Sequence, residues 1–560
     1  MVTLKVGTRP PWVGLGVSAW LLIASGNAAT FPLYSHSLKS ILGFNQHQLT
    51  LLGVACDIGE NMGLVPGIVC NKFPPWVIIS VGAFSCCFGY GVLWLALTRT
   101  VPTLPYWMLW VALCIATNSS TWLSTAVVVT NLRNFPLSRG TVAGILKGYI
   151  GLSAAVFTEI YSALLHQSSS MLLLFLAIGI PSLCLVLMCY VRPCIPASGD
   201  DASVSSYFLF IQAASVVLGI CLLAASILNS VLPLIAPVSL MFVAIMVLLL
   251  ITPLVIPLKM TLYPSNSGES ASSSEPENLV VRNYEWQFKT EPLLAPSSSS
   301  GSLNGSDSVS EVDVLLAEGH GTIRKRRRPR RGEDFTFAEA LVKADFWLLF
   351  LVYFVGVGSG VTVLNNLAQI GIAQGVENTT LLLCIFSFCN FVGRLGGGIL
   401  SEIFVRSRTM PRTIWITCTQ VVMSIVYLLF ASAMTGTLYA ATALLGVCYG
   451  VQFSVMIPTA SELFGLKHFG MIINFMSLGN PLGASLFSVL LAGILYDYEA
   501  AKQHRKSCIG PHCFRITFMV LAGVSSVGVM LSIVLTKRIK PVYQMLYSGG
   551  SFRMPQNSNK

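Results

Sequence analysis

The stretch GGGILSEIFVRSR, residues 396–408, leads from an apolar run through three glycines into a short charged segment. An altered copy, GIVCNKFPPW, begins at Gly67, which lies 331 residues before Gly398 (398 − 67 = 331). A second pair, GTVAGILKGYIGLSAAVF from Gly140 and GMIINFMSLGNPLGASLF from Gly470, has an offset of 330 (470 − 140 = 330). Chance alignment is the alternative, because membrane helices are rich in glycine. Two nearly equal offsets from separate places predict a chain built of two homologous halves.

The composition places these halves in a lipid bilayer. Of 560 residues, 54% are hydrophobic and only 10% are charged, whereas about 25% are charged in soluble domains. We find fourteen apolar stretches of about 20 residues, the length that spans a hydrocarbon core of about 30 Å. They group as six, two and six, at residues 13–34, 48–70, 75–98, 106–131, 139–165 and 170–191, then 206–229 and 233–257, then 345–365, 379–400, 412–432, 436–458, 469–496 and 515–536. The first stretch is long enough to span and lacks a small-residue cleavage site, so we expect it to stay as a helix.

The net charge of +11 is a topology signal rather than a nucleic-acid signal. With fourteen spans, the basic clusters fall on one side of the membrane and the opposite loops carry little charge, except the last one. The positive-inside rule therefore predicts that both termini are cytoplasmic. The sequence does not distinguish the plasma membrane from an endomembrane. The basic clusters are Lys5 and Arg9, Lys72, Arg133 and Arg139, Arg192, Arg324 to Arg331, Arg406 to Arg412, Lys467, and Lys537 to Lys540.

The repeated stretch resembles the G-x-L-a-D-R-x-G-R signature that follows the second helix of each half in the major facilitator superfamily. In residues 396–408, Glu402 takes the place of the acid. The resemblance implies that Gly398 allows close helix approach, while Glu402 and Arg406 form a charge clasp that holds one of two alternating states. Arg394, two turns upstream, is a candidate partner for Glu402.

The N-terminal copy of this signature is degenerate. It keeps Gly67 and Lys72, but Asn71 replaces the acid and Pro74 replaces a glycine. This half therefore lacks the carboxylate of the clasp.

A more specific resemblance extends over nearly the whole chain. The stretches SGNAATFPLYSHSLKSILGFNQHQLTLLGVACDIG (25–59) and NFPLSRGTVAGILKGYIGLSAAVF (134–157) are similar to the plant nodulin-like family of the major facilitator superfamily, related to the nuclear-fusion-defective membrane proteins. The stretches DFTFAEALVKADFWLLF (334–350) and CIGPHCF (508–514) resemble the C-terminal half of the same family. The chain departs from the family at Ala28 and Ala29, where many members carry an aromatic residue.

Three ionisable residues are expected deep in the membrane. Counted from Ser138, Lys147 lies nine residues into its helix, about 13 Å deep. Counted back from Cys70, Glu60 and Asp57 lie about 15 and 20 Å deep and share one helix face. Because a buried charge costs several kcal/mol unless it is paired or hydrated, we expect Lys147 to pair with Glu60 or Asp57. The pair either fixes helix packing or couples protons or substrate, and the sequence leaves both open.

Other polar residues offer weaker hypotheses. Asn365 and Asn366 near the end of the ninth stretch are candidates for substrate hydrogen bonds, although solvation at a helix end explains them as well. Glu159 lies near the outer end of the fifth stretch, where we expect it to reach the membrane interface. Gly140, Gly144 and Gly148 form a small-residue ridge for close helix packing.

The predicted organisation has five parts. Residues 1–195 form the N-terminal six-helix half, 196–258 two additional membrane helices, 259–344 a cytoplasmic disordered loop, 345–540 the C-terminal six-helix half, and 541–560 a cytoplasmic tail. The loop ends in RKRRRPRR, Arg324 to Arg331. Because a membrane helix follows, we expect this segment to meet anionic lipid or to enforce topology rather than to bind nucleic acid.

The cysteines and the missing motifs exclude several classes of protein. Most of the fifteen cysteines lie within apolar stretches, where they serve as packing residues. For Cys508 and Cys513, in a loop on the outer side, a disulfide is preferred over a metal site, and an unpaired state stays open. The sequence contains no Walker, haem or catalytic-triad motif, so we expect no cofactor, no metal and no enzymatic activity.

The sequence therefore predicts an all-α polytopic membrane protein with a major facilitator fold. We expect a monomeric secondary transporter or facilitator that carries a small solute by alternating access. The alternative is a non-transporting membrane sensor or adaptor that keeps the transporter fold, which the degenerate Asn71 copy favours. The solute, the direction of transport and the coupling ion are not determined by the sequence.

Overall fold

The computed structural model describes residues 9–44, 46–101, 104–194, 201–231, 236–262, 332–376, 379–433, 436–503 and 508–548. Within these ranges, fourteen helices are long and apolar enough to cross a membrane. The protein is therefore an integral, multi-pass membrane protein with an almost wholly helical fold. The polybasic segment Arg324–Arg331 lies outside the described residues.

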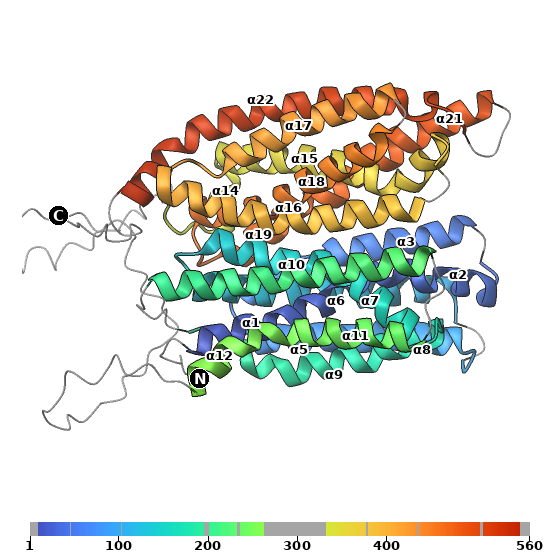
Figure 1. Cartoon of the computed structure of the whole chain (residues 1–560), viewed down its shortest axis with the longest axis horizontal. Helices are drawn as coiled ribbons and strands as arrows, with labels where there is room; N and C mark the ends of the chain where they lie inside the picture. Colours follow the sequence, from blue (N-terminus) through green and yellow to red (C-terminus); the bar gives the residue numbers. More distant parts are fainter. Residues whose placement is uncertain are drawn as a thin grey trace, which may run out of the picture.

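The N-terminal half contains six spans (Figure 1). In chain order its elements are α1 (Arg9–Ser25), the 3₁₀ turn η1 (Gly26–Thr30) and α2 (Phe31–Leu42), α3 (Gln46–Asn61) and α4 (Leu64–Cys70), α5 (Pro75–Leu97), α6 (Tyr106–Asn134), α7 (Arg139–Ala163), and α8 (Ser169–Leu174), η2 (Phe175–Gly179), α9 (Ile180–Leu187) and η3 (Met188–Tyr190).

Buried hydrogen bonds of Asn27 hold the 3₁₀ turn in the first span. Asn27 is fully buried and donates to Ser119 Oγ at 2.9 Å, while Tyr90 donates to Asn27 Oδ1 at 3.1 Å. A buried amide costs free energy unless it is hydrogen-bonded. These bonds therefore tie the first span to α5 and α6.

Two further spans separate the halves. They are α10 (Asp201–Val231), followed by α11 (Ala236–Ile251), η4 (Thr252–Leu254) and α12 (Val255–Leu262). Figure 1 shows α10 lying along the boundary between the two halves, and α10 contacts both α7 and α16.

The C-terminal half contains the last six spans. Its elements are α14 (Phe337–Leu341), α15 (Ala344–Ala373), α16 (Thr379–Arg408), α17 (Thr413–Ser432), α18 (Thr437–Phe464), α19 (Phe469–Ser477), α20 (Gly479–Gly483), the π-helix η5 (Ala484–Gly493), α21 (Ile494–Lys502) and α22 (His512–Ser548). Several helices are longer than the hydropathy pattern predicts: α15 continues to Ala373, α16 continues to Arg408, and α22 continues through residues 541–548 of the predicted tail. Polar residues on faces that point into the protein do not end a helix, although they lower its hydropathy.

The two repeated sequence pairs meet crosswise in space. A Cβ built at Gly67 would lie 2.7 Å from the carbonyl oxygen of Gly470, and one built at Gly140 would lie 2.9 Å from that of Gly398. Since Gly67 corresponds to Gly398 and Gly140 to Gly470 in the repeat, one contact is the pseudo-symmetric counterpart of the other. Both contacts join one half to the other, and only glycine permits such a close backbone approach.

These contacts lie at the end of the bundle where α1 begins and α22 ends (Figure 1). We call it the basic end, because Lys72, Arg133, Arg139, Arg412 and Lys467 lie at helix termini or loops there. The opposite end is called the far end.

Candidate functional site

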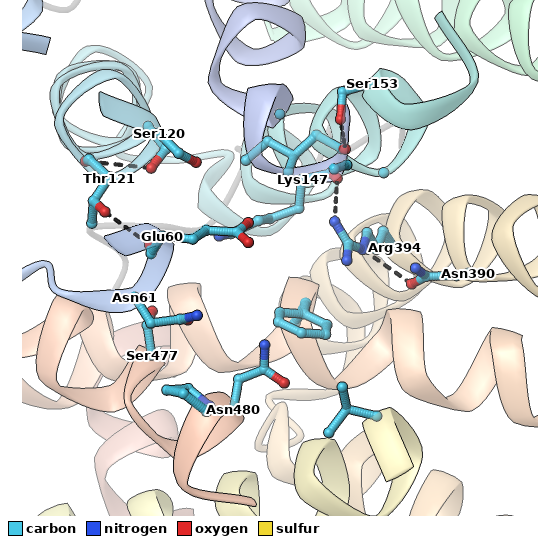
Figure 2. Close-up of a pocket in the computed structure, with 18 of the residues that line it drawn as sticks. Glu60, Asn61, Ser120, Thr121, Lys147, Ser153, Asn390, Arg394, Ser477 and Asn480 are labelled. Atoms are coloured by element: carbon cyan, nitrogen blue, oxygen red, sulfur yellow. Dashed lines mark hydrogen bonds between the residues drawn. The ribbon is translucent and has the colours of Figure 1, made fainter. Parts of the chain in front are cut away.

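A cavity of about 370 Å³ lies between the two halves. The N-terminal half contributes residues of α3, α6 and α7, and the C-terminal half contributes residues of α15, α16, α18, α19 and α20. Figure 2 shows the polar side chains that line it. We call it the central cavity.

Asp57 and Glu60 form the acidic wall of the central cavity. They occupy one face of α3, and both are exposed, toward the cavity. The neighbouring Gly59 packs against Thr117 of α6, and Thr121 donates to the carbonyl oxygen of Glu60 at 2.8 Å. This tight packing of α3 on α6 directs the two carboxylates away from α6 and into the cavity.

Lys147 lines the same cavity from α7. In Figure 2 the side chains of Lys147 and Glu60 point toward one another, as expected from their depths in the membrane. Within the described residues, no ion pair of Lys147 with a carboxylate is present. The predicted ion pair is therefore not formed, and the side chains of Lys147 and Glu60 both line the central cavity, where a polar solute has access to them.

Arg394 lies in the central cavity rather than beside Glu402, where the sequence had placed a candidate partner. Its Nε donates to Asn390 Oδ1 at 3.0 Å, and its Nη1 donates to the carbonyl oxygen of Lys147 at 3.0 Å. The guanidinium also stacks over the ring of Phe453, 4.6 Å from its centroid. Arg394 thus brings a second positive charge to the site and links α16 to α7. The sequence shows the charge but not the helix face that carries it.

Neutral polar residues complete the lining. Ser120, Thr121, Ser124 and Thr125 come from α6, and Asn474, Ser477 and Asn480 come from the segment after α18. The hydroxyl of Thr125 and the side chain of Asn474 are hydrogen-bonded across the two halves at 2.9 Å. In the repeat, Ser477 corresponds to Lys147, so matching positions of the two halves both face the cavity.

The two asparagines predicted as substrate ligands differ in their surroundings. Asn365 is exposed toward the central cavity. Asn366 donates to Ser488 Oγ at 3.0 Å and to the carbonyl oxygen of Thr362 at 2.8 Å, so its side chain joins α15 to η5. The structure therefore brings Asn365, and not Asn366, into the cavity.

A buried charge cluster closes the basic end between α7 and α16. Glu402 Oε2 accepts from the backbone N–H of Gly140 at 2.7 Å, which is a contact between halves. The same carboxylate binds Arg412 at 2.8 Å and Arg406 at 2.9 Å. Arg406 also donates to the carbonyl oxygen of Leu137 and to Ser138 Oγ, both in the N-terminal half.

Arg412 is the centre of this cluster and is fully buried. It binds Glu462 at 2.7 Å as well as Glu402. Although burial lowers the pKa of the Arg412 guanidinium, the carboxylates of Glu402 and Glu462 hold that pKa well above its usual range. Sequence reasoning did not assign Arg412 or Glu462 to the clasp, because neither lies within the repeated signature.

The counterpart of the clasp, between α4 and α19, lacks these charges. Gly67 packs on Gly470, and the side-chain oxygen of Asn71 is buried without a hydrogen-bond partner among the described residues. Lys72 is exposed at the basic end. Within the described residues this contact therefore has no counterpart of the Glu402–Arg412 ion pair, and Arg133 joins the halves beside it by donating to the carbonyl oxygen of Leu466 at 2.9 Å.

The remaining predicted residues are structural in this arrangement. Cβ atoms built at Gly144 and Gly148 would lie 3.0 Å from the carbonyl oxygen of Arg394 and 3.3 Å from the ring of Phe391, so the ridge on α7 faces α16. Cys508 and Cys513 form a disulfide at the far end. Within the described residues, no group of three or more His, Cys, Asp and Glu side chains is arranged to hold a metal ion.

Two family models match the sequence, Nodulin-like over residues 11–258 and the NFD4 C-terminal domain over residues 333–545. The N-terminal part of the chain is therefore a nodulin-like domain, and the C-terminal part matches the NFD4 C-terminal domain. The protein NUCLEAR FUSION DEFECTIVE 4 of Arabidopsis thaliana is 29% identical to this chain over 555 residues, which cover 96% of this chain and 90% of the Arabidopsis protein. YhjX of Escherichia coli K12, described as an uncharacterized MFS-type transporter, is 30% identical over 157 residues, which cover 27% of this chain and 38% of YhjX.

Solved structures show which fold this protein has. The proton:xylose symporter XylE, bound to 6-bromo-6-deoxy-D-glucose, matches with a TM-score of 0.51 and 10% identity over 93% of this chain and 94% of XylE. A double tryptophan mutant of XylE matches with a TM-score of 0.55 and 12% identity over 97% of this chain and 100% of the mutant. This protein thus has the major facilitator fold, with two additional helices.

Proposed function

We propose that this protein is a secondary transporter that carries a small polar solute through the central cavity by alternating access. The observation that carries the proposal is a polar cavity between two pseudo-symmetric halves, closed at the basic end by contacts that join the halves. Three kinds of contact between the halves lie at that end. Gly140 N–H donates to Glu402, Arg133 donates to the carbonyl oxygen of Leu466 at 2.9 Å, and the paired glycines pack backbone to backbone. A rocking motion that breaks these contacts would expose the cavity to the other side.

The lining favours a solute that is neutral overall. Asp57 and Glu60 contribute two negative charges, Lys147 and Arg394 contribute two positive charges, and the remaining polar residues are neutral. A multiply charged solute would leave two like charges uncompensated in a low-dielectric site, which is costly. We therefore infer a zwitterionic or uncharged polar solute.

The basic end is proposed to face the cytoplasm. Basic residues gather at this end, and the positive-inside rule places such an end on the cytoplasmic side of the membrane. Both termini would then be cytoplasmic, the central cavity would open away from the cytoplasm, and the disulfide of Cys508 and Cys513 would lie on the oxidising side.

Uptake into proteoliposomes tests the proposed function. The purified full chain is assayed against a panel of labelled zwitterionic, neutral and charged metabolites, in parallel with Arg394→Gln and the control Arg408→Gln, whose side chain is exposed at the basic end. We expect uptake of at least one polar solute, loss of that uptake in Arg394→Gln, and retention in Arg408→Gln. Equal uptake by both variants would contradict the assignment of the central cavity as the solute site.

A non-transporting sensor is the second candidate, and one observation favours it. The Asn71 side chain leaves the contact between α4 and α19 without the charges that hold its counterpart. If a solute stabilises the purified protein through Arg394 but is never taken up, the sensor is the better description.

A further inference from the structure

A second cavity, of about 190 Å³, lies beside the central cavity. Its walls come from α7, from the first additional helix α10, and from the start of α16. We call it the side chamber. Gly151, Ala154 and Ser387 line both cavities, so these three small residues form the boundary between them.

Glu159 is the ionisable group of the side chamber. The sequence predicts that it reaches the membrane interface, but the residue is only 5% exposed, and its Oε1 atom has no hydrogen-bond partner among the described residues. The described residues that line the chamber include no Lys, Arg or His. A buried carboxylate with neither a cation nor a full set of donors is costly, and an acid inside a membrane protein is by default a candidate functional group.

The additional helix α10 completes the chamber. Ser215 on α10 donates to the hydroxyl of Tyr149 at 3.0 Å, which holds α10 to α7. Ser226 on the same helix lies 3.0 Å from the sulfur of Cys384, and a Cβ built at Gly219 would lie 2.8 Å from the ring of Phe391, so α10 is also held to α16. Because α10 forms one wall of the chamber and packs against both α7 and α16, the chamber depends on this additional helix.

We propose that the side chamber binds an ammonium group, with Glu159 as its counter-ion. The neutral polar side chains of Thr158, Ser226 and Asn229 line the chamber with Glu159, and Phe388 contributes an aromatic wall. Carboxylate and hydroxyl oxygens accept the hydrogen bonds of an ammonium group, and an aromatic face attracts its charge. The volume is smaller than that of pockets for drug-sized ligands, which begin at about 300 Å³, so the chamber suits an ammonium head with a few carbon atoms.

The two cavities differ in the charge of their linings, so we expect them to favour different ligands. In the central cavity two basic residues, Lys147 and Arg394, balance two carboxylates, whereas the side chamber contains one carboxylate and, among the described residues that line it, no basic side chain. A cationic group is therefore favoured in the side chamber over the central cavity. Binding there does not depend on transport, so the side chamber is tested separately from the proposed function.

The test measures the thermal stability of the full chain in nanodiscs of phosphatidylcholine, with n-propylammonium chloride as the probe and 1-propanol as its uncharged control. A ligand that binds only the folded protein raises the Tm with the logarithm of its concentration. We expect n-propylammonium to raise the Tm of the unchanged protein and of Glu60→Gln, but not that of Glu159→Gln. If Glu159→Gln fails to fold, Ser226→Leu serves instead, because it fills the chamber from the opposite wall and keeps Glu159.

A second arm identifies the source of the ammonium group. If phosphatidylethanolamine in the nanodiscs raises the Tm through Glu159 while free n-propylammonium does not, the occupant is a lipid headgroup; a response to the free amine indicates a soluble amine. Three results overturn the proposal: no rise with either amine, the same rise in Glu159→Gln, or the same rise with 1-propanol. If neither amine acts and Glu159→Gln is more stable than the unchanged protein, the carboxyl is simply protonated and the chamber has no ammonium ligand.

Discussion

Replacing Glu402 with glutamine should open the basic end of the protein. Glu402 joins the halves through its 2.7 Å contact with the backbone N–H of Gly140, and it also binds Arg412 at 2.8 Å within the C-terminal half. Glu462 binds the same Arg412 at 2.7 Å and is equally buried, but the side chains that bind it, Arg412 and Tyr547, both belong to the C-terminal half. Glu462→Gln is therefore a matched control, because it weakens the same cluster without touching the N-terminal half.

The free energy lost by the closed state follows from the weakened hydrogen bond between Gly140 and the side chain at position 402. A hydrogen bond to a charged group contributes about 1.5–3 kcal/mol, and a neutral one about 0.5–1.5 kcal/mol. The amide side chain of the Glu402→Gln variant would keep a neutral acceptor for the N–H of Gly140, so the state with the basic end closed loses about 1–1.5 kcal/mol. Since about 1.4 kcal/mol corresponds to a factor of ten, the population with the basic end open should rise about five- to tenfold.

A cysteine in the central cavity reports this population. In Ser477→Cys, the thiol faces the cavity, and a membrane-impermeant maleimide added on the basic-end side reaches it only when that end opens. The labelling rate, corrected for the protein without this cysteine, should rise about five- to tenfold with Glu402→Gln and stay within about twofold with Glu462→Gln. An equal rise in both variants, or no rise in either, would refute the reasoning that the clasp selects the closed state.

Further predictions concern packing, the buried charges and topology. Gly144→Leu should abolish uptake, because a Cβ at this position already lies 3.0 Å from the carbonyl oxygen of Arg394 and overpacking costs about 1–3 kcal/mol. Gly91→Leu is the control: a Cβ at Gly91 has no neighbouring atom within 4 Å, so this variant should transport normally in the same assay. Lys147→Met should lower the Tm and the yield by leaving Glu60 without the opposite charge it faces, and adding Glu60→Gln should restore both. If the double variant then transports with unchanged pH dependence, the charges are structural; if it exchanges solute but no longer accumulates it, they couple protons. A cysteine introduced at Ser298 should resist impermeant reagents added outside intact cells, and its labelling would contradict the proposed topology.

The sequence by itself determined the architecture of the protein. Fourteen apolar stretches of spanning length and two repeats with offsets of 330 and 331 predicted a duplicated membrane bundle with two additional helices. The fourteen spans of the structure and its likeness to the solved XylE structures agree with this fold. Spanning a bilayer is a local property, because each helix satisfies its own backbone hydrogen bonds, and length and hydropathy suffice to detect it. Depth along a helix is local as well, so counting residues placed Lys147 and Glu60 at the same level.

Tertiary structure alone decided which helix faces meet. Arg394 lies about one helical turn before Gly398 in the sequence, but the rotation of α16 turns it into the central cavity, where it binds the carbonyl oxygen of Lys147. The clasp likewise depends on Arg412 and Glu462, which are 50 residues apart and meet only through packing of the C-terminal half. Glu159 is buried because α10 lies across the boundary of the two halves, and no periodicity in the sequence encodes that position. Rotation about a helix axis and the order of helices around a bundle are set by packing among distant segments, and hydropathy carries no signal for either when nearly every residue is apolar.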